Sequence, residues 1–201
     1  MQVAHGGSTV TGVSTPPPAR DRILETASRL FYAEGIHAVG VDRIVTEAGV
    51  TRATFYRHFP GKEELIRSYL VGRDAALREG AAKVLASGAT GAEGVLLVVE
   101  RLGAKMRREG FRGCPFINAA AEYPDPAHPV SVAIAAHRAW LLGLFTELLR
   151  GGGWPDPRAT AEHLVLLRDG AMVGAALGDP VAVARRLTAA VAGVLSAAGR
   201  T

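Results

Sequence analysis

The sequence predicts an all-α protein. Apolar residues recur every three or four positions along most of the chain, and this spacing gives a helix one apolar face. Glycine and proline, which interrupt helices, separate these periodic segments. No stretch alternates Val, Ile or Thr with polar residues in the way that predicts a strand. About nine helices are therefore expected over the 201 residues.

The first expected helix runs from about Ala19 to Gly35. Ile23 and Ala27 lie on its apolar face, and Gly35 allows the backbone to leave the helix. Pro60 prevents the third helix from continuing. The other helices are expected at about residues 41–48, 52–59, 62 to beyond 77, 92–108, 115–122, 130–150, 158–177 and 180–198.

Composition restricts the class of protein. Hydrophobic residues make up 48% of the chain, which is enough for a substantial core, and the net charge of +4 is modest. No run of about 18 uncharged apolar residues is present, so no membrane span is expected. The start of the sequence lacks an apolar block behind a basic segment, which argues against a signal peptide. A single cysteine, Cys114, fits a reducing cytoplasm, where we expect the protein to be located.

Two short helices joined by a tight turn are expected between Val41 and Phe59. Gly49 can take the left-handed backbone that ends the first of them. The hydroxyl of Thr51 can cap the second. This arrangement is a helix-turn-helix, whose second helix can enter the major groove of DNA. The segment 51–62 contains three Arg or Lys residues and no acidic residue, which suits reversible contact with phosphates.

The chain from about Arg20 to Tyr69 resembles the DNA-binding region of TetR-family transcriptional regulators. The resemblance rests on an Ala-Gly-Val-Thr turn, a Phe-Tyr-Arg-His-Phe run and a Gly-Lys-Glu-Glu-Leu helix start. The family usually has Ser or Thr at the position of Gly40, and glycine as a cap costs roughly a few tenths of a kcal/mol. Together with composition, the resemblance implies a disordered tail at 1–18, a helix-turn-helix DNA-binding domain at 19–79 and an effector-binding and dimerisation domain at 80–201.

The first turn of the third helix is expected to lie nearest the base edges. Arg52 can donate two hydrogen bonds to guanine. Thr54 can bond a base edge or place its methyl group on thymine, and Ala53 leaves room for the helix to approach. These three residues are expected to set the operator sequence, because base contacts specify and phosphate contacts position.

Other residues are expected to contact the phosphate backbone. By resemblance, the Tyr56 hydroxyl reaches a phosphate, and Arg57 or His58 adds a contact. Lys62 stands at a helix start, where its charge and the helix end both attract anions. Two alternatives remain open, in which the Tyr56 ring packs internally or His58 makes a structural hydrogen bond. The candidate DNA-binding residues are Arg43, Thr46, Thr51, Arg52, Ala53, Thr54, Tyr56, Arg57, His58 and Lys62.

The second half of the chain is expected to bind an effector and to dimerise. The resemblance implies a homodimer formed by the last two helices and a small-molecule effector inside each subunit. Residues 113–129 resemble a recurring stretch of one TetR subgroup. No Arg or Lys cluster is expected on the apolar helix faces, so the effector is predicted to be mainly apolar. The candidate effector-binding residues are Met106, Cys114, Phe116, Asn118, Tyr123, Trp140 and Leu144.

Each of these residues also has a structural interpretation. Asn118 can tie a neighbouring backbone group, and Cys114 can act as a small core residue. Trp140 and Leu144 share a helical spacing that a solid core allows equally well. In that case no cavity would lie between them.

The sequence therefore predicts a ligand-responsive, sequence-specific transcriptional regulator. It is expected to be a repressor that an apolar effector releases from a palindromic operator, without a cofactor or metal. One alternative is an enzyme that uses Cys114 with His128 or His137, although Pro115 has no amide proton for an oxyanion hole. The other alternative is a helical interaction module that does not bind DNA.

Overall fold

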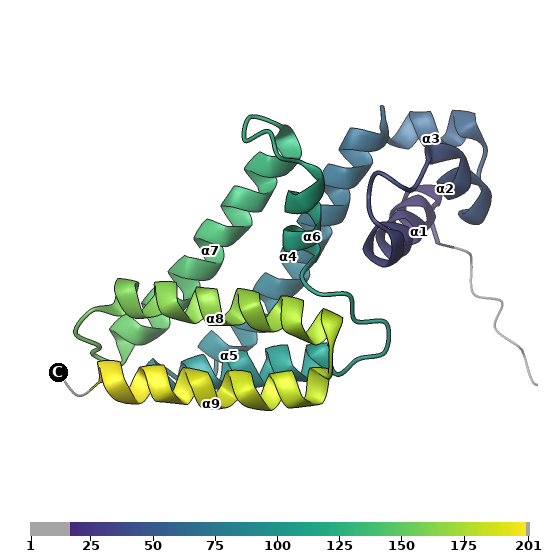
Figure 1. Ribbon diagram of the computed structural model, residues 1–201. Helices are drawn as coiled ribbons and strands as arrows, with labels where there is room; N and C mark the ends of the chain where they lie inside the picture. Colours follow the sequence, from purple (N-terminus) through teal and green to yellow (C-terminus); the bar gives the residue numbers. More distant parts are fainter. Residues whose placement is uncertain (1–16, 200–201) are drawn as a thin grey trace, which may run out of the picture.

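The computed structural model describes residues 17–199, and within them the chain forms nine α-helices and no strand (Figure 1). The all-α prediction is confirmed. The predicted tail at 1–18 lies outside the described residues, apart from Pro17 and Pro18. The helices are α1 (Ala19–Glu34), α2 (Val41–Glu47), α3 (Arg52–His58), α4 (Lys62–Leu85), α5 (Gly91–Met106), α6 (Pro115–Glu122), α7 (Pro129–Gly151), α8 (Pro157–Leu177) and α9 (Pro180–Ala198).

The three short helices α1, α2 and α3 form a small unit at one end of the molecule (Figure 1). Helix α4 leaves this unit and runs into a larger bundle. There α5, α8 and α9 lie side by side, while α4 and α7 cross them (Figure 1). The predicted domain boundary at residue 79 falls inside α4, which is one continuous helix through Leu85.

The helix starts follow the chemistry expected from the sequence. The Thr51 hydroxyl accepts a hydrogen bond from the Thr54 amide at 3.1 Å, which is the predicted cap of α3. Asp156 and Asp179 cap α8 and α9 in the same way. Gly40 precedes α2 without a side-chain cap, so the amides at the start of that helix depend on other acceptors.

Close packing around α5 depends on glycine. A Cβ atom placed on Gly94 would lie 2.8 Å from the Ala89 carbonyl oxygen and 2.8 Å from a methyl carbon of Leu148 on α7. Glycine at this position therefore lets α5 and α7 approach each other more closely than alanine would allow. This contact holds the far end of the bundle together, away from the α1–α3 unit (Figure 1).

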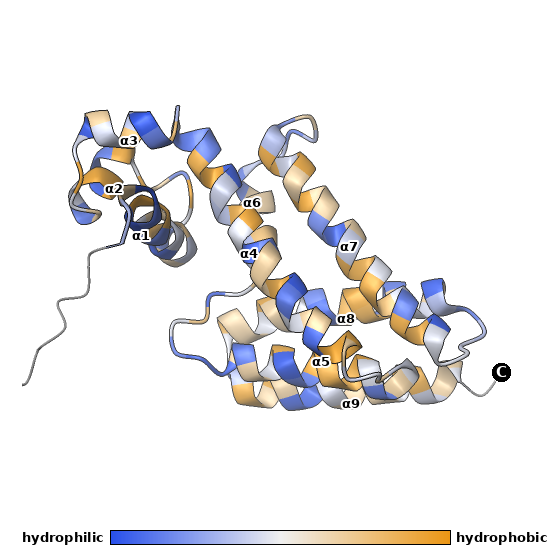
Figure 2. Ribbon diagram, turned by 180° about the vertical axis from the view of Figure 1, so that it is seen from behind, coloured by the Kyte–Doolittle hydropathy of each residue, from blue (hydrophilic) through white to orange (hydrophobic). Residues whose placement is uncertain are grey.

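Two helices, α7 and α9, are long and apolar enough to cross a membrane when judged by length and composition alone (Figure 2). The same property is common in the core helices of globular proteins, so it is weak evidence for a membrane span. In this fold α7 packs against α4, α5 and α8, and α9 packs against α5 and α8.

The packing around α5 generates a prediction. Gly94→Ala is expected to lower the free energy of unfolding by about 1–3 kcal/mol, because overpacking forces the surroundings to move. Gly72 on α4 is the matched control, because no atom lies within 4 Å of a Cβ placed there. Gly72→Ala is expected to raise the same free energy by roughly 0.5–1 kcal/mol through helix propensity.

Guanidinium unfolding followed by circular dichroism measures both variants, at one protein concentration because assembly affects stability. Equal stabilisation by the two substitutions would show that α5 and α7 do not approach closely at Gly94.

Candidate functional site

The helix-turn-helix forms as the sequence predicts. Gly49 adopts a positive φ of 62°, which is the left-handed backbone that glycine permits. The Val50 amide donates to the Val45 carbonyl at 3.2 Å and closes the turn. Phe55 and Phe59 are buried in the unit, so the opposite face of α3 is turned toward solvent.

The first turn of α3 presents the residues expected to read bases. Arg52 is exposed over 64% of its side chain, and its Nε donates to Asp42 Oδ1 at 2.7 Å. Ala53 is also exposed. The Thr54 hydroxyl lies 3.0 Å from that of Thr51, so the cap also orients Thr54. The three residues share one accessible turn, and Asp42 holds the guanidinium across it.

The next turn of α3 carries the expected phosphate contacts. Tyr56 is 50% exposed and touches Phe55 only edge-on, with ring centroids 5.2 Å apart. This differs from the alternative in which the Tyr56 ring packs inside the unit. Arg57 is exposed, and neither Arg57 nor His58 has a side-chain hydrogen bond or ion pair to any residue within 17–199. These side chains are therefore available to a partner.

Three other predicted contacts are engaged within the protein. Arg43 bonds Glu34 and also Glu47, the latter at 2.8 Å, and these carboxylates raise the pKa of Arg43 further. The Thr46 hydroxyl donates to the Asp42 carbonyl at 2.9 Å. The Lys62 amine lies over the Phe31 ring, 6.0 Å from its centroid, and burial lowers the pKa of this amine. Each of these side chains would have to move in order to meet a phosphate.

Two hydrogen-bonded ties join the α1–α3 unit to the bundle. The Tyr32 hydroxyl donates to the Gly113 carbonyl and accepts from the Arg112 amide, both at 2.9 Å. The Glu122 carboxylate on α6 accepts from the amides of Ile36 and His37, at 2.8 and 2.6 Å. The Tyr32 tie could not be predicted from the sequence, because its partners are backbone groups about 80 residues away.

The predicted effector-binding residues do not converge on one cavity. Trp140 and Leu144 line a cavity of about 440 Å³ between α4, α5 and α7. Cys114 and Phe116 line a separate groove against α8. Asn118 lies at a third depression near α1, where its amide donates to the Arg112 carbonyl at 2.9 Å. This contact matches the structural interpretation of Asn118, in which its side chain bonds a neighbouring backbone group. Met106 and Tyr123 line none of these three spaces.

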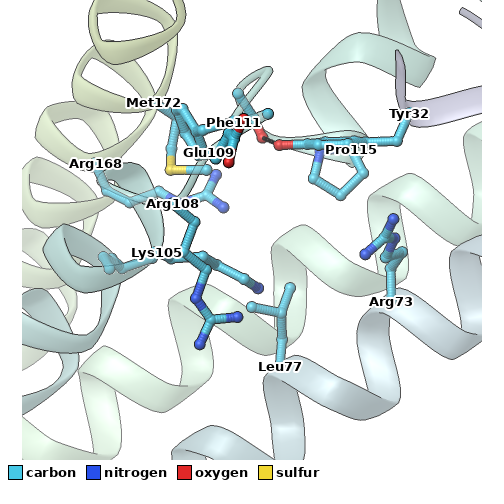
Figure 3. Close-up of a pocket in the computed structure, with 13 residues that line it drawn as sticks. Tyr32, Arg73, Leu77, Lys105, Arg108, Glu109, Phe111, Pro115, Arg168 and Met172 are labelled. Carbon is cyan, nitrogen blue, oxygen red and sulfur yellow. Dashed lines mark hydrogen bonds between the residues drawn. The ribbon is translucent and has the colours of Figure 1, made fainter. Parts of the chain in front are cut away.

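The sequence predicts no Arg or Lys cluster on the apolar helix faces, yet four cations meet at one cavity, and one of them, Arg168, is buried. A cavity of about 160 Å³ is lined by Arg73 from α4, Lys105 from α5, Arg108 just after α5, and Arg168 from α8. Figure 3 shows Arg73 and Lys105 facing the same open space from two sides, with Arg108 and Arg168 beside Lys105. These residues come from three separate parts of the sequence, so only the fold brings their charges together.

Arg168 is the most buried of these cations, with 4% of its surface exposed. It donates to Asp169 at 2.7 Å and to the Cys114 sulfur at 3.2 Å, while its Nε is buried without a hydrogen-bond partner. His137 is also buried, bonds Asp74 at 2.7 Å and stacks on Phe116 at 3.6 Å. Burial lowers the pKa of His137.

The groups proposed for an enzyme are therefore engaged in other contacts. Cys114 accepts a hydrogen bond from a buried arginine, and His137 bonds an aspartate. Within residues 17–199, no group of three or more His, Cys, Asp or Glu side chains lies close enough together to hold a metal ion.

Comparison with known proteins also indicates a DNA-binding regulator. The profile of bacterial regulatory proteins of the tetR family matches residues 23–69. The HTH-type transcriptional regulator LmrA of Bacillus subtilis (strain 168) is 29% identical over 151 residues, which is 74% of this chain and 80% of LmrA. SCO4454, a TetR-family transcriptional regulator from Streptomyces coelicolor, is 49% identical in sequence to this chain. Its crystal structure superposes with a TM-score of 0.88, and the match covers 90% of this chain and 96% of SCO4454.

The fold is shared more widely still. The reduced form of NemR from E. coli superposes with a TM-score of 0.78 at 21% identity, over 87% of this chain and 95% of that chain. TetR-family relatives are transcriptional regulators and not enzymes, which argues against the enzyme alternative. On its match to SCO4454 across 90% of its length, this chain belongs to the TetR family of helix-turn-helix DNA-binding transcriptional regulators.

Proposed function

We propose that this regulator is a homodimeric repressor that leaves a palindromic operator when a small molecule binds inside the bundle. The observation that carries the DNA-reading part is the exposed polar face of α3, where Arg52, Ala53 and Thr54 share one accessible turn. A cytoplasmic location follows from this role. We assign DNA binding to residues 19–79 and effector binding with dimerisation to residues 80–201, with α4 shared between the two parts.

In this proposal Arg52 exchanges its partner on binding DNA. The exposed pair with Asp42 contributes little to stability, because water screens it on both sides. A guanine offers two acceptors in the major groove in place of one carboxylate oxygen. Tyr56 and Arg57 support contact with phosphates, whereas Arg43 is already neutralised by two glutamates and is the weakest of the candidates.

The support for dimerisation is an apolar stripe on the outer face of α8. Leu166 and Leu177 are 68% and 84% exposed, and Val173 lies on the same face of the helix. Val181 at the start of α9 is also exposed. Large side chains gathered on adjacent helices mark a protein interface more often than they mark bare surface. A dimer formed here would present two α3 helices to successive major grooves, so the operator would be palindromic.

The support for control by a ligand is the pair of ties to the α1–α3 unit. Tyr32 borders the interior cavity of about 160 Å³ and also bonds the segment that precedes α6. A ligand that fits one position of this segment better than another would change the orientation of the reading helices. It can do so only by its difference in affinity for the two states.

The DNA-reading assignment predicts different losses at two arginines. Arg52→Ala is expected to cost about 1–3 kcal/mol on the preferred operator and to relax sequence preference, because it removes a base contact. Arg57→Ala is expected to weaken binding to all duplexes and to reduce the salt slope by roughly one unit, because it removes a phosphate contact. Binding of selected genomic fragments and of unrelated duplexes, titrated with salt, measures both effects.

The control is Arg150→Ala, because this exposed residue lies in the last turn of α7, and that end of α7 is far from the α1–α3 unit (Figure 1). It should leave both affinity and salt slope unchanged. If both α3 variants lost the same free energy on every sequence, Arg52 would be a phosphate contact and its proposed role would be rejected.

The dimer assignment predicts that Leu177→Glu raises the dimer dissociation constant at least about tenfold, because a buried unpaired carboxylate is costly. Leu85→Glu is the control, since Leu85 is an exposed leucine at the end of α4 and lies outside the α8 stripe. Sedimentation equilibrium over a concentration range measures both variants. A wild-type protein that stays monomeric at micromolar concentration would contradict the assignment.

A further inference from the structure

We propose that the effector is an amphipathic organic acid, whose anionic group lies among Arg73, Lys105, Arg108 and Arg168 and whose apolar body extends along Trp140 and Leu144. This inference rests on the proposed function, because it assigns a chemical class to the effector of that regulator. It replaces the mainly apolar effector that the sequence predicts.

The first support is that three of the four cations have no acidic partner among the described residues. Within residues 17–199, no carboxylate lies in ion-pair distance of Arg73, Lys105 or Arg108. Glu109 borders the same cavity but forms no ion pair with any of them. Lys105 and Arg108 are open to solvent and Arg168 is buried, so the cluster lies where the cavity meets the surface. Like charges held close together repel one another, although water screens part of the repulsion at the open side. An anion placed between them removes this repulsion.

Arg168 supplies the buried part of the site. Only two of its nitrogens are matched by partners, Asp169 and Cys114, and its Nε is buried with no acceptor. A cysteine sulfur is a weaker hydrogen-bond acceptor than a carboxylate oxygen. Charge-assisted hydrogen bonds from arginine to a carboxylate or a related acid are shorter and stronger. The buried guanidinium can therefore gain from an anionic oxygen in the cavity.

The lowered pKa of Lys105 also supports an anion at this site. Desolvation lowers the pKa of its amine, and the nearby Arg73 and Arg108 lower it further. A lowered pKa means that the charged form of this amine is less stable in the protein than the charged form of a free lysine is in water. A bound anion would favour the charged amine and raise that pKa.

The second support is that the cationic cavity and the apolar cavity lie next to each other. Five residues line both spaces, namely Leu77, Leu102, Lys105, Arg108 and Arg168. The volumes are about 160 Å³ at the cationic end and about 440 Å³ beside Trp140 and Leu144. Cavities of this total size hold small organic ligands. A ligand that fills both spaces needs a small charged end and a larger apolar end.

The position of Arg73 connects this site to the DNA-reading unit. Its guanidinium stacks over the Tyr32 ring, 5.1 Å from the centroid, and its Nε has no hydrogen-bond partner. Tyr32 in turn holds Gly113 and Arg112. An anion that draws Arg73 toward Lys105 therefore changes the support of Tyr32 and the tie that it makes.

A matched pair of fluorescent probes tests the proposal on the full-length protein. 8-Anilinonaphthalene-1-sulfonate carries a sulfonate, and N-phenyl-1-naphthylamine has the same aromatic body without it. The wild type is expected to bind the sulfonate at least about tenfold more tightly, as one charge-assisted contact implies. Decanoate should displace the sulfonate probe at a concentration at least about tenfold lower than 1-decanol does.

The double variant Lys105→Gln/Arg108→Gln is expected to lose about tenfold in affinity for the sulfonate probe and less than twofold for the neutral probe. The matched control is Arg107→Gln/Arg150→Gln, which removes two exposed charges that line neither cavity. It should bind both probes as the wild type does. Thermal melting checks that each variant is folded, and Lys105→Gln alone replaces the double variant if that one unfolds.

Equal affinity of the wild type for the two probes would overturn the inference, as would equal losses in the control and in the double variant. A different measurement would reject the proposed function, namely DNA binding by the wild type without ligand. If that protein binds no genomic duplex, the proposed function fails. If the wild type binds DNA and shows no preference for the charged probe, only the acid class of the effector is rejected.

Discussion

The orientation of the DNA-reading unit depends on α4, a single helix that both parts of the molecule share. Near its start, Leu65 and Tyr69 are buried against the α1–α3 unit. Near its end, Ala81 and Val84 are buried in the bundle. An α-helix transmits displacement along its axis because every turn is hydrogen-bonded to the next. A change at the middle of α4 therefore reaches both ends.

Arg73 occupies this middle position, with its guanidinium over the ring of Tyr32. Tyr32 makes one of the two ties between the α1–α3 unit and the bundle, and Glu122 makes the other. Both ties join a side chain to backbone groups, so they hold a chain segment in position and do not depend on which side chains that segment carries. Such contacts are few and lie near the surface, which makes them the easiest part of the interface to rearrange. The architecture thus combines a stiff connection with two contacts that a ligand can bias.

The helix-turn-helix could be predicted because its signals are local. The apolar stripe, the left-handed Gly49 and the Thr51 cap all lie between residues 41 and 65, and each acts within a few positions of itself. The same reasoning located all nine helices of the described chain to within a few residues, apart from the end of α4. The contact of Arg43 with Glu34 and that of Lys62 with Phe31 were missed, because each partner lies on another helix.

The interior site could not be predicted for a related reason. Arg73, Lys105 and Arg168 lie on three separate helices and Arg108 follows the end of α5, and only the crossing of α4, α5 and α8 brings them to one cavity. Asn118 shows the opposite case, since its polar side chain suggested a ligand contact but ties a carbonyl six positions earlier. Periodicity identifies which face of a helix is apolar, and it does not identify which charges meet after folding.

Charge is arranged differently at the two sites, and this difference fits their roles. On α3, Arg52 keeps an exposed carboxylate partner, and water screens this pair. Breaking the pair therefore costs little free energy, and the free energy of DNA binding depends on whether a matching base replaces it. At the cavity, no carboxylate of residues 17–199 pairs with Arg73, Lys105 or Arg108, so the proposed anion would reduce the repulsion between these cations. A ligand can act on a regulator only through a difference in affinity between two conformations. In the proposed mechanism the cation cluster would supply such a difference, because a shift of α4 would move Arg73 relative to the other cations.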